Sequence, residues 1–136
     1  MTVSEKQAQL IEDLQIVEDV QERLSAVVSR FARRSLLPAQ RINEWKVPGC
    51  VSNVWLVPEL RDGCCHFAFD ADSPMVKGLV GLLCEVYDGG RPEQIAATGP
   101  ELWSKLGFLK LLSPTRLNGL AAVRARIKTF AEHAAV

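Results

Sequence analysis

The segment from Met75 to Tyr87 most constrains the fold, because apolar side chains occur on almost every side of the helix that it predicts. Asp72-Ser73-Pro74 supplies a cap and a first-turn proline, and Gly89-Gly90 ends the helix. A helix without a wide polar face must be covered by other elements on all sides. We therefore expect this helix at the centre of the molecule.

Two runs of β-branched and aromatic residues precede this helix, from Val51 to Val57 and from Cys65 to Phe69. The segment between them, Pro58 to Gly63, ends in Asp-Gly, which is a strong turn signal. The pattern predicts an antiparallel hairpin with its turn centred near residues 60 to 62.

Helical spacing of apolar residues also runs from about Ile11 to Arg34, as one helix or two. Further helices are expected from Pro92, from Pro100 to Leu106, and from Ser113 to about His133. We expect residues 36–48 to form an irregular connection and residues 1–10 to be a loose N-terminal segment. The class is α+β, a small antiparallel sheet packed against helices, in a single domain of 136 residues.

Charge and composition exclude several kinds of partner. Sixteen Lys and Arg balance sixteen Asp and Glu, so no overall charge attracts nucleic acid or an anionic membrane. No stretch approaches the ~20 apolar residues that cross a bilayer, and the polar N-terminus lacks the apolar core of a signal peptide. These features predict a cytoplasmic protein whose cysteines stay reduced, with neither nucleic acid nor a membrane as a partner.

The four cysteines fall at different places in this scheme. Cys84 lies in the apolar helix and Cys65 alternates with Phe67 and Phe69, so both are expected in the core. Cys64 is beside the hairpin turn, on the order of 25 Å of strand away from Cys50. Metal ligands must converge within about 2.3 Å of one ion, so we predict no metal site made by Cys50, Cys64, Cys65 and His66.

Cys50 has a more unusual setting than the other three. It follows Pro48-Gly49, where glycine permits a tight turn and the close approach of another molecule, and a rigid strand comes after it. A thiol on a loop held by a firm scaffold suits a reaction with an external group. From the residues alone, such a thiol and a cysteine that merely begins a strand are equally supported. No histidine is near in sequence, so a Cys-His pair of the protease kind is poorly supported.

Three segments, VPGCVSNVWL, DADSPMVKGLVGLL and LSPTRLNGL, resemble in order and separation the SufE and CsdE family of sulfur acceptors. The resemblance runs from roughly residue 10 to the C-terminus and implies a fold like that of IscU-type scaffolds. It implies that the chain takes persulfide sulfur from a pyridoxal-phosphate cysteine desulfurase of the SufS or CsdA kind. The chain would stimulate that enzyme and pass the sulfur to a downstream iron–sulfur scaffold complex, without binding a cofactor itself.

By motif, the resemblance makes Cys50 the acceptor. It assigns further residues to the surroundings of Cys50 and to the surface that the desulfurase contacts: Gly49, Ser52, Asp70, Asp72, Arg116 and Asn118. Val51 stands where the family commonly has glutamine, and Pro74 replaces a small residue. The change at Val51 leaves the sulfur chemistry intact but alters the polarity of the loop or its preference for a partner.

Sulfur transfer needs a thiolate that attacks the outer sulfur of a persulfide. An ordinary cysteine, with a pKa of ~8.5, is only a few per cent thiolate at neutral pH. Asp70 and Asp72 would oppose ionisation of Cys50 within about 4–6 Å. We therefore hypothesise that this acidic pair serves docking, and that Cys50 is unreactive until the desulfurase binds.

The sequence leaves two other functions open. An iron–sulfur or zinc scaffold of the IscU type needs three convergent ligands, which the hairpin keeps apart. A binding module would stimulate a desulfurase without taking sulfur. A free-standing thiol hydrolase would need a base that the sequence does not supply, so we expect a sulfur-transfer accessory protein with a covalent persulfide rather than an independent enzyme.

Overall fold

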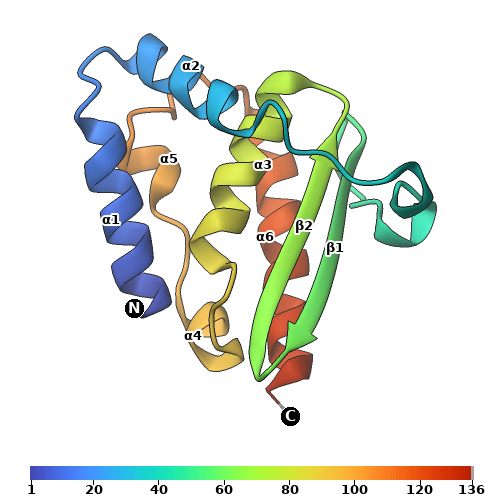
Figure 1. The fold of residues 1–136 in the computed structure, drawn as a ribbon. Helices are drawn as coiled ribbons and strands as arrows, with labels where there is room; N and C mark the ends of the chain where they lie inside the picture. The colour runs from blue at the N-terminus through green and yellow to red at the C-terminus, as the bar shows by residue number, and fades with distance from the viewer. Residues whose placement is uncertain (136) are drawn as a thin grey trace.

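A two-stranded sheet and a set of helices make up residues 1–135, the part of the chain that the computed structural model describes (Figure 1). The sheet consists of β1 (Val54–Arg61) and β2 (Cys64–Ala71). The helices are α1 (Val3–Gln15), α2 (Val20–Phe31), α3 (Pro74–Tyr87), α4 (Pro92–Ala97), α5 (Leu102–Lys105) and α6 (Pro114–Ala134). The α+β class is confirmed.

Helix α3 lies at the centre, as predicted. It contacts β2, α1, α2 and α6, and residues Leu79 to Cys84 are all buried. The Ser73 hydroxyl accepts a hydrogen bond from the Val76 N–H at 3.4 Å and caps the helix. Every face of α3 is thus covered, as its apolar sequence requires.

Helix α2 crosses α3 at two glycines. A Cβ added at Gly78 would lie 2.8 Å from the Cα of Val28, and one at Gly81 would lie 2.5 Å from the ring of Phe31. No side chain fits at either distance without moving its neighbour. These two glycines therefore allow α2 and α3 to pack closely.

The hairpin is longer than expected and is shifted along the chain. Its turn is Asp62-Gly63, with φ values of 54° and 78°, which suits a two-residue type I′ turn. Val54 pairs with Ala71, so β1 begins three residues later than Val51. The prediction of a strand from Val51 was wrong, because β2 ends at Ala71 and leaves residues 51–53 without a full partner strand.

The expectation of a loose N-terminal segment was also wrong. Helix α1 begins at Val3, where the Thr2 hydroxyl accepts from the Glu5 N–H at 3.1 Å and the Glu5 carboxylate accepts from the Thr2 N–H at 2.9 Å. This capping box satisfies donors at the helix start. Val3 and Leu10 are buried, so the segment belongs to the core.

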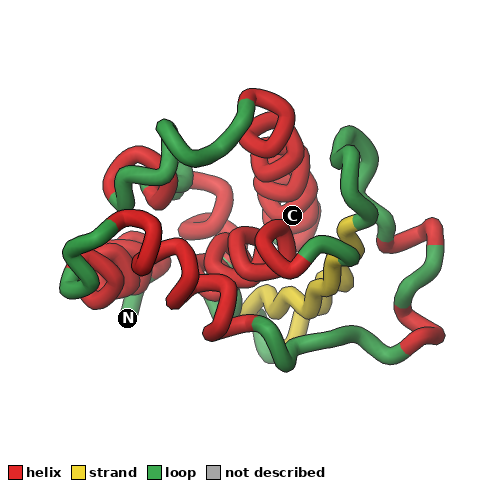
Figure 2. The backbone as a smooth tube through the Cα atoms, turned by 90° about the horizontal axis from the view of Figure 1, so that it is seen from above, coloured by secondary structure: helices red, strands yellow, loops and turns green. Residues whose placement is uncertain are grey.

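The connection, defined as residues 32–46, joins α2 to the site described below. It contains two short 3-10 turns, η1 (Pro38–Gln40) and η2 (Asn43–Trp45). Figures 1 and 2 both show it passing outside the hairpin, on the side away from α1. The connection thus covers the end of the outer hairpin face that carries Trp55 and Asp70, whereas Glu59 and Ala68 on the same face stay exposed.

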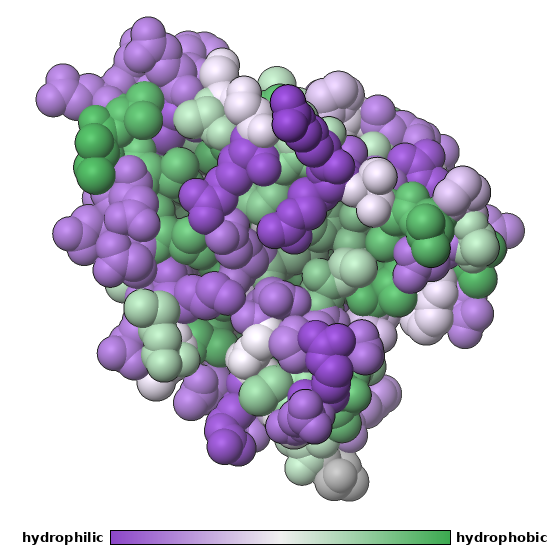
Figure 3. All heavy atoms as spheres, in the orientation of Figure 1, coloured by the Kyte–Doolittle hydropathy of each residue, from purple (hydrophilic) through white to green (hydrophobic). Residues whose placement is uncertain are grey.

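The outer surface is mixed in character. Figure 3 shows hydrophilic side chains spread over much of one face, with hydrophobic groups exposed between them. Among residues 1–135, none of the helices combines the length and the hydropathy that crossing a bilayer requires.

Candidate functional site

Cys50 lies on the Cys50 loop, defined as residues 47–53, which runs from the connection to β1. Gly49 has a φ of 88°, a left-handed conformation that favours glycine, and turns the chain directly before the cysteine. The half-buried Cys50 thiol donates a weak hydrogen bond to the carbonyl oxygen of Gly119 in α6, with the sulfur 3.5 Å from the oxygen. The loop therefore rests its thiol against the first turns of α6.

A cavity of about 180 Å³ opens beside this thiol. Its buried lining is apolar and comes from β1, α3 and α6: Val54, Leu79, Val80, Leu120 and Val123. The lining nearer to solvent is mixed: it has the apolar Val51 and Val76 beside four polar residues, Ser52, Ser113, Thr115 and Arg116. The thiol thus borders a small chamber that is apolar inside and partly polar at its rim.

Burial raises the pKa of the Cys50 thiol above its ordinary value. Desolvation disfavours the thiolate, so the thiol of the resting protein stays protonated at neutral pH. The hypothesis that Cys50 is unreactive in the free protein gains support from this setting, and it stays a prediction.

Two of the expected site residues lie on α6. Helix α6 starts at the Ser113 cap, whose hydroxyl accepts from the Arg116 N–H at 3.2 Å. The half-buried side chain of Arg116 lines the cavity and makes no hydrogen bond or ion pair with another residue of the described chain, 1–135. Asn118 is exposed and does not line the cavity. The structure thus brings Arg116, and not Asn118, to the thiol.

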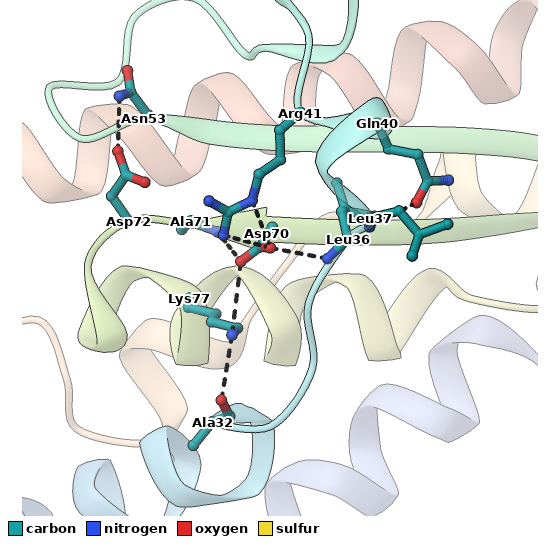
Figure 4. A network of polar contacts seen from close by, with 10 residues as sticks. All are labelled: Ala32, Leu36, Leu37, Gln40, Arg41, Asn53, Asp70, Ala71, Asp72 and Lys77. Carbon is teal, nitrogen blue, oxygen red and sulfur yellow. Dashed lines mark hydrogen bonds and ion pairs between the residues drawn. The ribbon is translucent and has the colours of Figure 1, made fainter.

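Asp72 holds the far end of the Cys50 loop. Its carboxylate accepts a hydrogen bond from the side-chain amide of Asn53 at 2.7 Å, and its N–H donates to the Asn53 carbonyl at 3.1 Å (Figure 4). Asp72 is exposed, and so is Val51 in the Cys50 loop, at 85%. Sequence reasoning missed Asn53, because only the register of the hairpin places it beside Asp72.

Asp70 differs from the expectation that it forms part of a docking surface, because its side chain is completely buried. It accepts hydrogen bonds from the Leu36 N–H at 2.9 Å and from the Arg41 guanidinium at 2.7 and 3.0 Å (Figure 4). Lys77 lies 3.7 Å away on the other carboxylate oxygen. In this conformation the Asp70 carboxylate fixes the connection to the sheet and is closed to a partner.

The pKa of Asp70 reflects this network. Burial alone would raise it, but hydrogen bonds from Leu36, Arg41 and Ala71 and the charge of Arg41 bring it below its ordinary value. The Arg41 guanidinium also lies 4.9 Å from the centre of the Trp55 ring. Trp55 is itself buried, so its ring packs within the fold.

The remaining cysteines lie away from this site. Cys65 and Cys84 are buried, as predicted, and burial raises the pKa of both thiols. Cys64 is half-buried and pairs with Arg61 next to the turn, at the end of the hairpin farthest from Cys50. Within residues 1–135, no three His, Cys, Asp or Glu side chains lie close enough together to hold a metal ion.

Known proteins resemble the chain over most of its length. Residues 8–131 match the SufE family, described as an Fe-S metabolism associated domain. A SufE-like protein of Rhizobium meliloti (strain 1021) is 31% identical over 130 residues, which cover 91% of this chain and 93% of the relative. A SufE-like protein of Rhizobium etli is 34% identical over 126 residues, which cover 88% and 85%.

The fold is also similar to that of a solved structure. The solution structure of a hypothetical protein from Thermus thermophilus covers 95% of each chain with a TM-score of 0.77 and 23% sequence identity. That likeness concerns the fold alone. The family match and the two relatives together show that this chain belongs to the SufE family, whose domain is associated with iron–sulfur metabolism.

Proposed function

We propose that this protein accepts sulfane sulfur on Cys50 from the persulfide of a cysteine desulfurase and passes it on for iron–sulfur cluster assembly. The observation that carries the proposal is the position of the Cys50 thiol, which lies on a loop and borders an apolar cavity. Membership of a family associated with iron–sulfur metabolism supports the same reading. The pyridoxal phosphate belongs to the desulfurase, and this chain contributes the accepting sulfur.

The transfer step needs neither an oxidant nor a reductant. The Cys50 thiolate attacks the outer sulfur of the donor persulfide, and a new S–S bond forms. The S–S bond of the donor breaks, and its electron pair leaves with the donor cysteine as a thiolate. The outer sulfur keeps its hydrogen, so Cys50 becomes a persulfide. The negative charge passes from the Cys50 sulfur to the sulfur of the donor cysteine.

The loop must open for this step, because the donor belongs to another protein while the Cys50 sulfur lies against Gly119. Gly49 can absorb such a movement, since glycine tolerates the backbone changes of a hinge. Leaving the cavity restores water to the thiol and so removes the burial that raises its pKa. Docking and activation would thus be coupled.

The cavity offers protection after transfer. A persulfide returned to the apolar chamber is screened from water and from small thiols that would remove its outer sulfur. Arg116, at the rim, supplies a positive charge that favours an anionic sulfur. These two features suit a carrier that must hold sulfur between two partners, the desulfurase and a downstream scaffold complex.

Mass spectrometry of the intact protein tests the proposal. After incubation with cysteine and a desulfurase, the wild type should gain the mass of one sulfur atom, removable by reductant and mapped to Cys50. Cys50→Ser should gain none and should lose the stimulation of the desulfurase, whereas the matched variant Cys64→Ser should behave as the wild type. Full stimulation by Cys50→Ser would instead indicate a regulatory module that takes no sulfur.

A further inference from the structure

Three glycines lie inside helices of the described chain, residues 1–135, and one of them is unlike the other two. A Cβ at Gly78 or Gly81 would approach a neighbouring helix to 2.8 Å or 2.5 Å. A Cβ at Gly119, in α6, would have its nearest contact at 3.6 Å, which is an ordinary van der Waals distance. Packing against other helices therefore accounts for Gly78 and Gly81 but not for Gly119.

Backbone conformation does not account for Gly119 either. The residue has no positive φ, and it lies in a regular helix, where alanine is more favourable than glycine. By these criteria alanine would fit and would stabilise α6. The three atoms nearest to an added Cβ are all from Cys50: its Sγ, Cα and Cβ, at 3.6, 3.9 and 4.0 Å. The space left by the missing Cβ of Gly119 is therefore space beside Cys50.

We propose that Gly119 is a positioning residue that keeps open the space for the second sulfur of a Cys50 persulfide. This inference rests on the proposed acceptor function. An outer sulfur lies about 2.05 Å from the Sγ to which it is bonded. A Cβ at position 119 would already be in contact with the Sγ at 3.6 Å, so an outer sulfur on that side would overlap it.

The same geometry distinguishes the two states of Cys50. The resting thiol has room beside either glycine or alanine, since the added contact is ordinary. The persulfide is larger by one sulfur atom and needs part of the cavity that Gly119 helps to line. Alanine at position 119 should therefore leave the thiol unchanged and exclude the persulfide, because overfilling a packed site is unfavourable.

The experiment compares Gly119→Ala with Gly99→Ala. Gly99 is a suitable control, since a Cβ there meets nothing within 4 Å and its φ is not positive. Both variants and the wild type are charged with a desulfurase and cysteine, separated from the enzyme and exposed to dithiothreitol. Intact mass then gives the fraction of persulfide and its rate of loss. Thermal unfolding and the rate of Cys50 alkylation are measured on the uncharged proteins.

We expect the wild type and Gly99→Ala to hold sulfur equally. Gly119→Ala should hold about tenfold less or lose it about tenfold faster, which corresponds to about 1.4 kcal/mol. Its unfolding temperature should not fall, and alkylation of its thiol should be unchanged.

Three results would overturn the role of Gly119. The first is a persulfide on Gly119→Ala as abundant and as durable as that of the wild type. The second is a lowered unfolding temperature, which would make Gly119 a packing residue. The third is slower alkylation in proportion to the loss of sulfur, which would place the effect on the thiol itself. A wild type that takes up no sulfur would contradict the acceptor function instead, and the two failures are thereby distinguished.

Discussion

The connection of residues 32–46 and the Cys50 loop that follows it are held in very different ways. The connection is fixed by the fully buried carboxylate of Asp70, which accepts from Leu36 and Arg41. The Cys50 loop is held by one weak thiol hydrogen bond and, at its far end, by an exposed side-chain hydrogen bond and a backbone hydrogen bond between Asn53 and Asp72. A buried charge pair is costly to break, whereas an exposed hydrogen bond to a carboxylate contributes little.

This difference indicates a division of work between neighbouring segments. A firmly held connection keeps the start of the Cys50 loop in place, and weak contacts allow the rest of the loop to leave the cavity. Opening by breaking a few surface contacts costs far less than global unfolding. Weakening the contacts of Asp70 and of Asp72 in turn tests this division, and the larger effect is expected at Asp70.

Asp70→Asn should have the largest effect on stability. The change removes the charge that Arg41 and Lys77 face, and breaking such a pair costs about 3 kcal/mol, at the low end for buried pairs because the Arg41 side chain is 38% exposed. Urea unfolding at neutral pH measures the loss. Asp72→Asn, two residues away, is the control. Equal losses in the two variants would remove the distinction between the two segments.

The acid sensitivity of the fold should depend on the same residue. The folded pKa of Asp70 lies below its ordinary value, because its hydrogen bonds and the charge of Arg41 outweigh its burial. Such a carboxyl stabilises the protein above the unfolded pKa of about 3.9, and the contribution is lost as the pH falls through the folded value. The free energy of unfolding of the wild type should therefore fall more steeply below about pH 4 than that of Asp70→Asn. Parallel curves would contradict this.

Asp72→Asn should have the smallest effect on stability but should loosen the loop. Losing one exposed charge-assisted hydrogen bond from Asn53 costs about 1 kcal/mol or less. If that contact holds the loop closed, alkylation of Cys50 should become faster by up to about fivefold. Timed labelling followed by mass spectrometry gives the rate, with Asp62→Asn, at the hairpin turn, as the control. An unchanged rate would show that Asn53 and Asp72 do not restrain Cys50.

Local patterns predicted much of the fold, since they act within one element. Three of the confirmed features are properties of short segments. They are the apolar side chains on all faces of α3, its Ser73 cap, and the alternation that buries Cys65 and Phe67. The start of β1 was misplaced, because strand ends depend on where the partner strand stops. The helix at Val3 was missed, although its Thr2 and Glu5 carry a capping-box signature.

The sequence predicted which residues form the site, but it did not predict that Asp70 is buried. The three motifs pointed to Cys50 and Arg116, which the structure brings to one cavity. Strand alternation places Asp70 on the face opposite to Phe69, which would be open to solvent in an uncovered hairpin. The irregular connection covers the Trp55 and Asp70 end of that face, where the Leu36 N–H and the Arg41 guanidinium donate hydrogen bonds to the carboxylate. Such coverage by a segment without periodicity cannot be read from a local pattern.

The most direct test of a sheltered but openable acceptor is the alkylation rate of Cys50 at neutral pH, measured with and without a cysteine desulfurase. We expect slow labelling of the isolated protein, where burial raises the pKa of the thiol, and much faster labelling once the desulfurase has drawn the loop open. A Cys50 that labels in the isolated protein as fast as a free cysteine, or that the desulfurase leaves unchanged, would contradict this expectation.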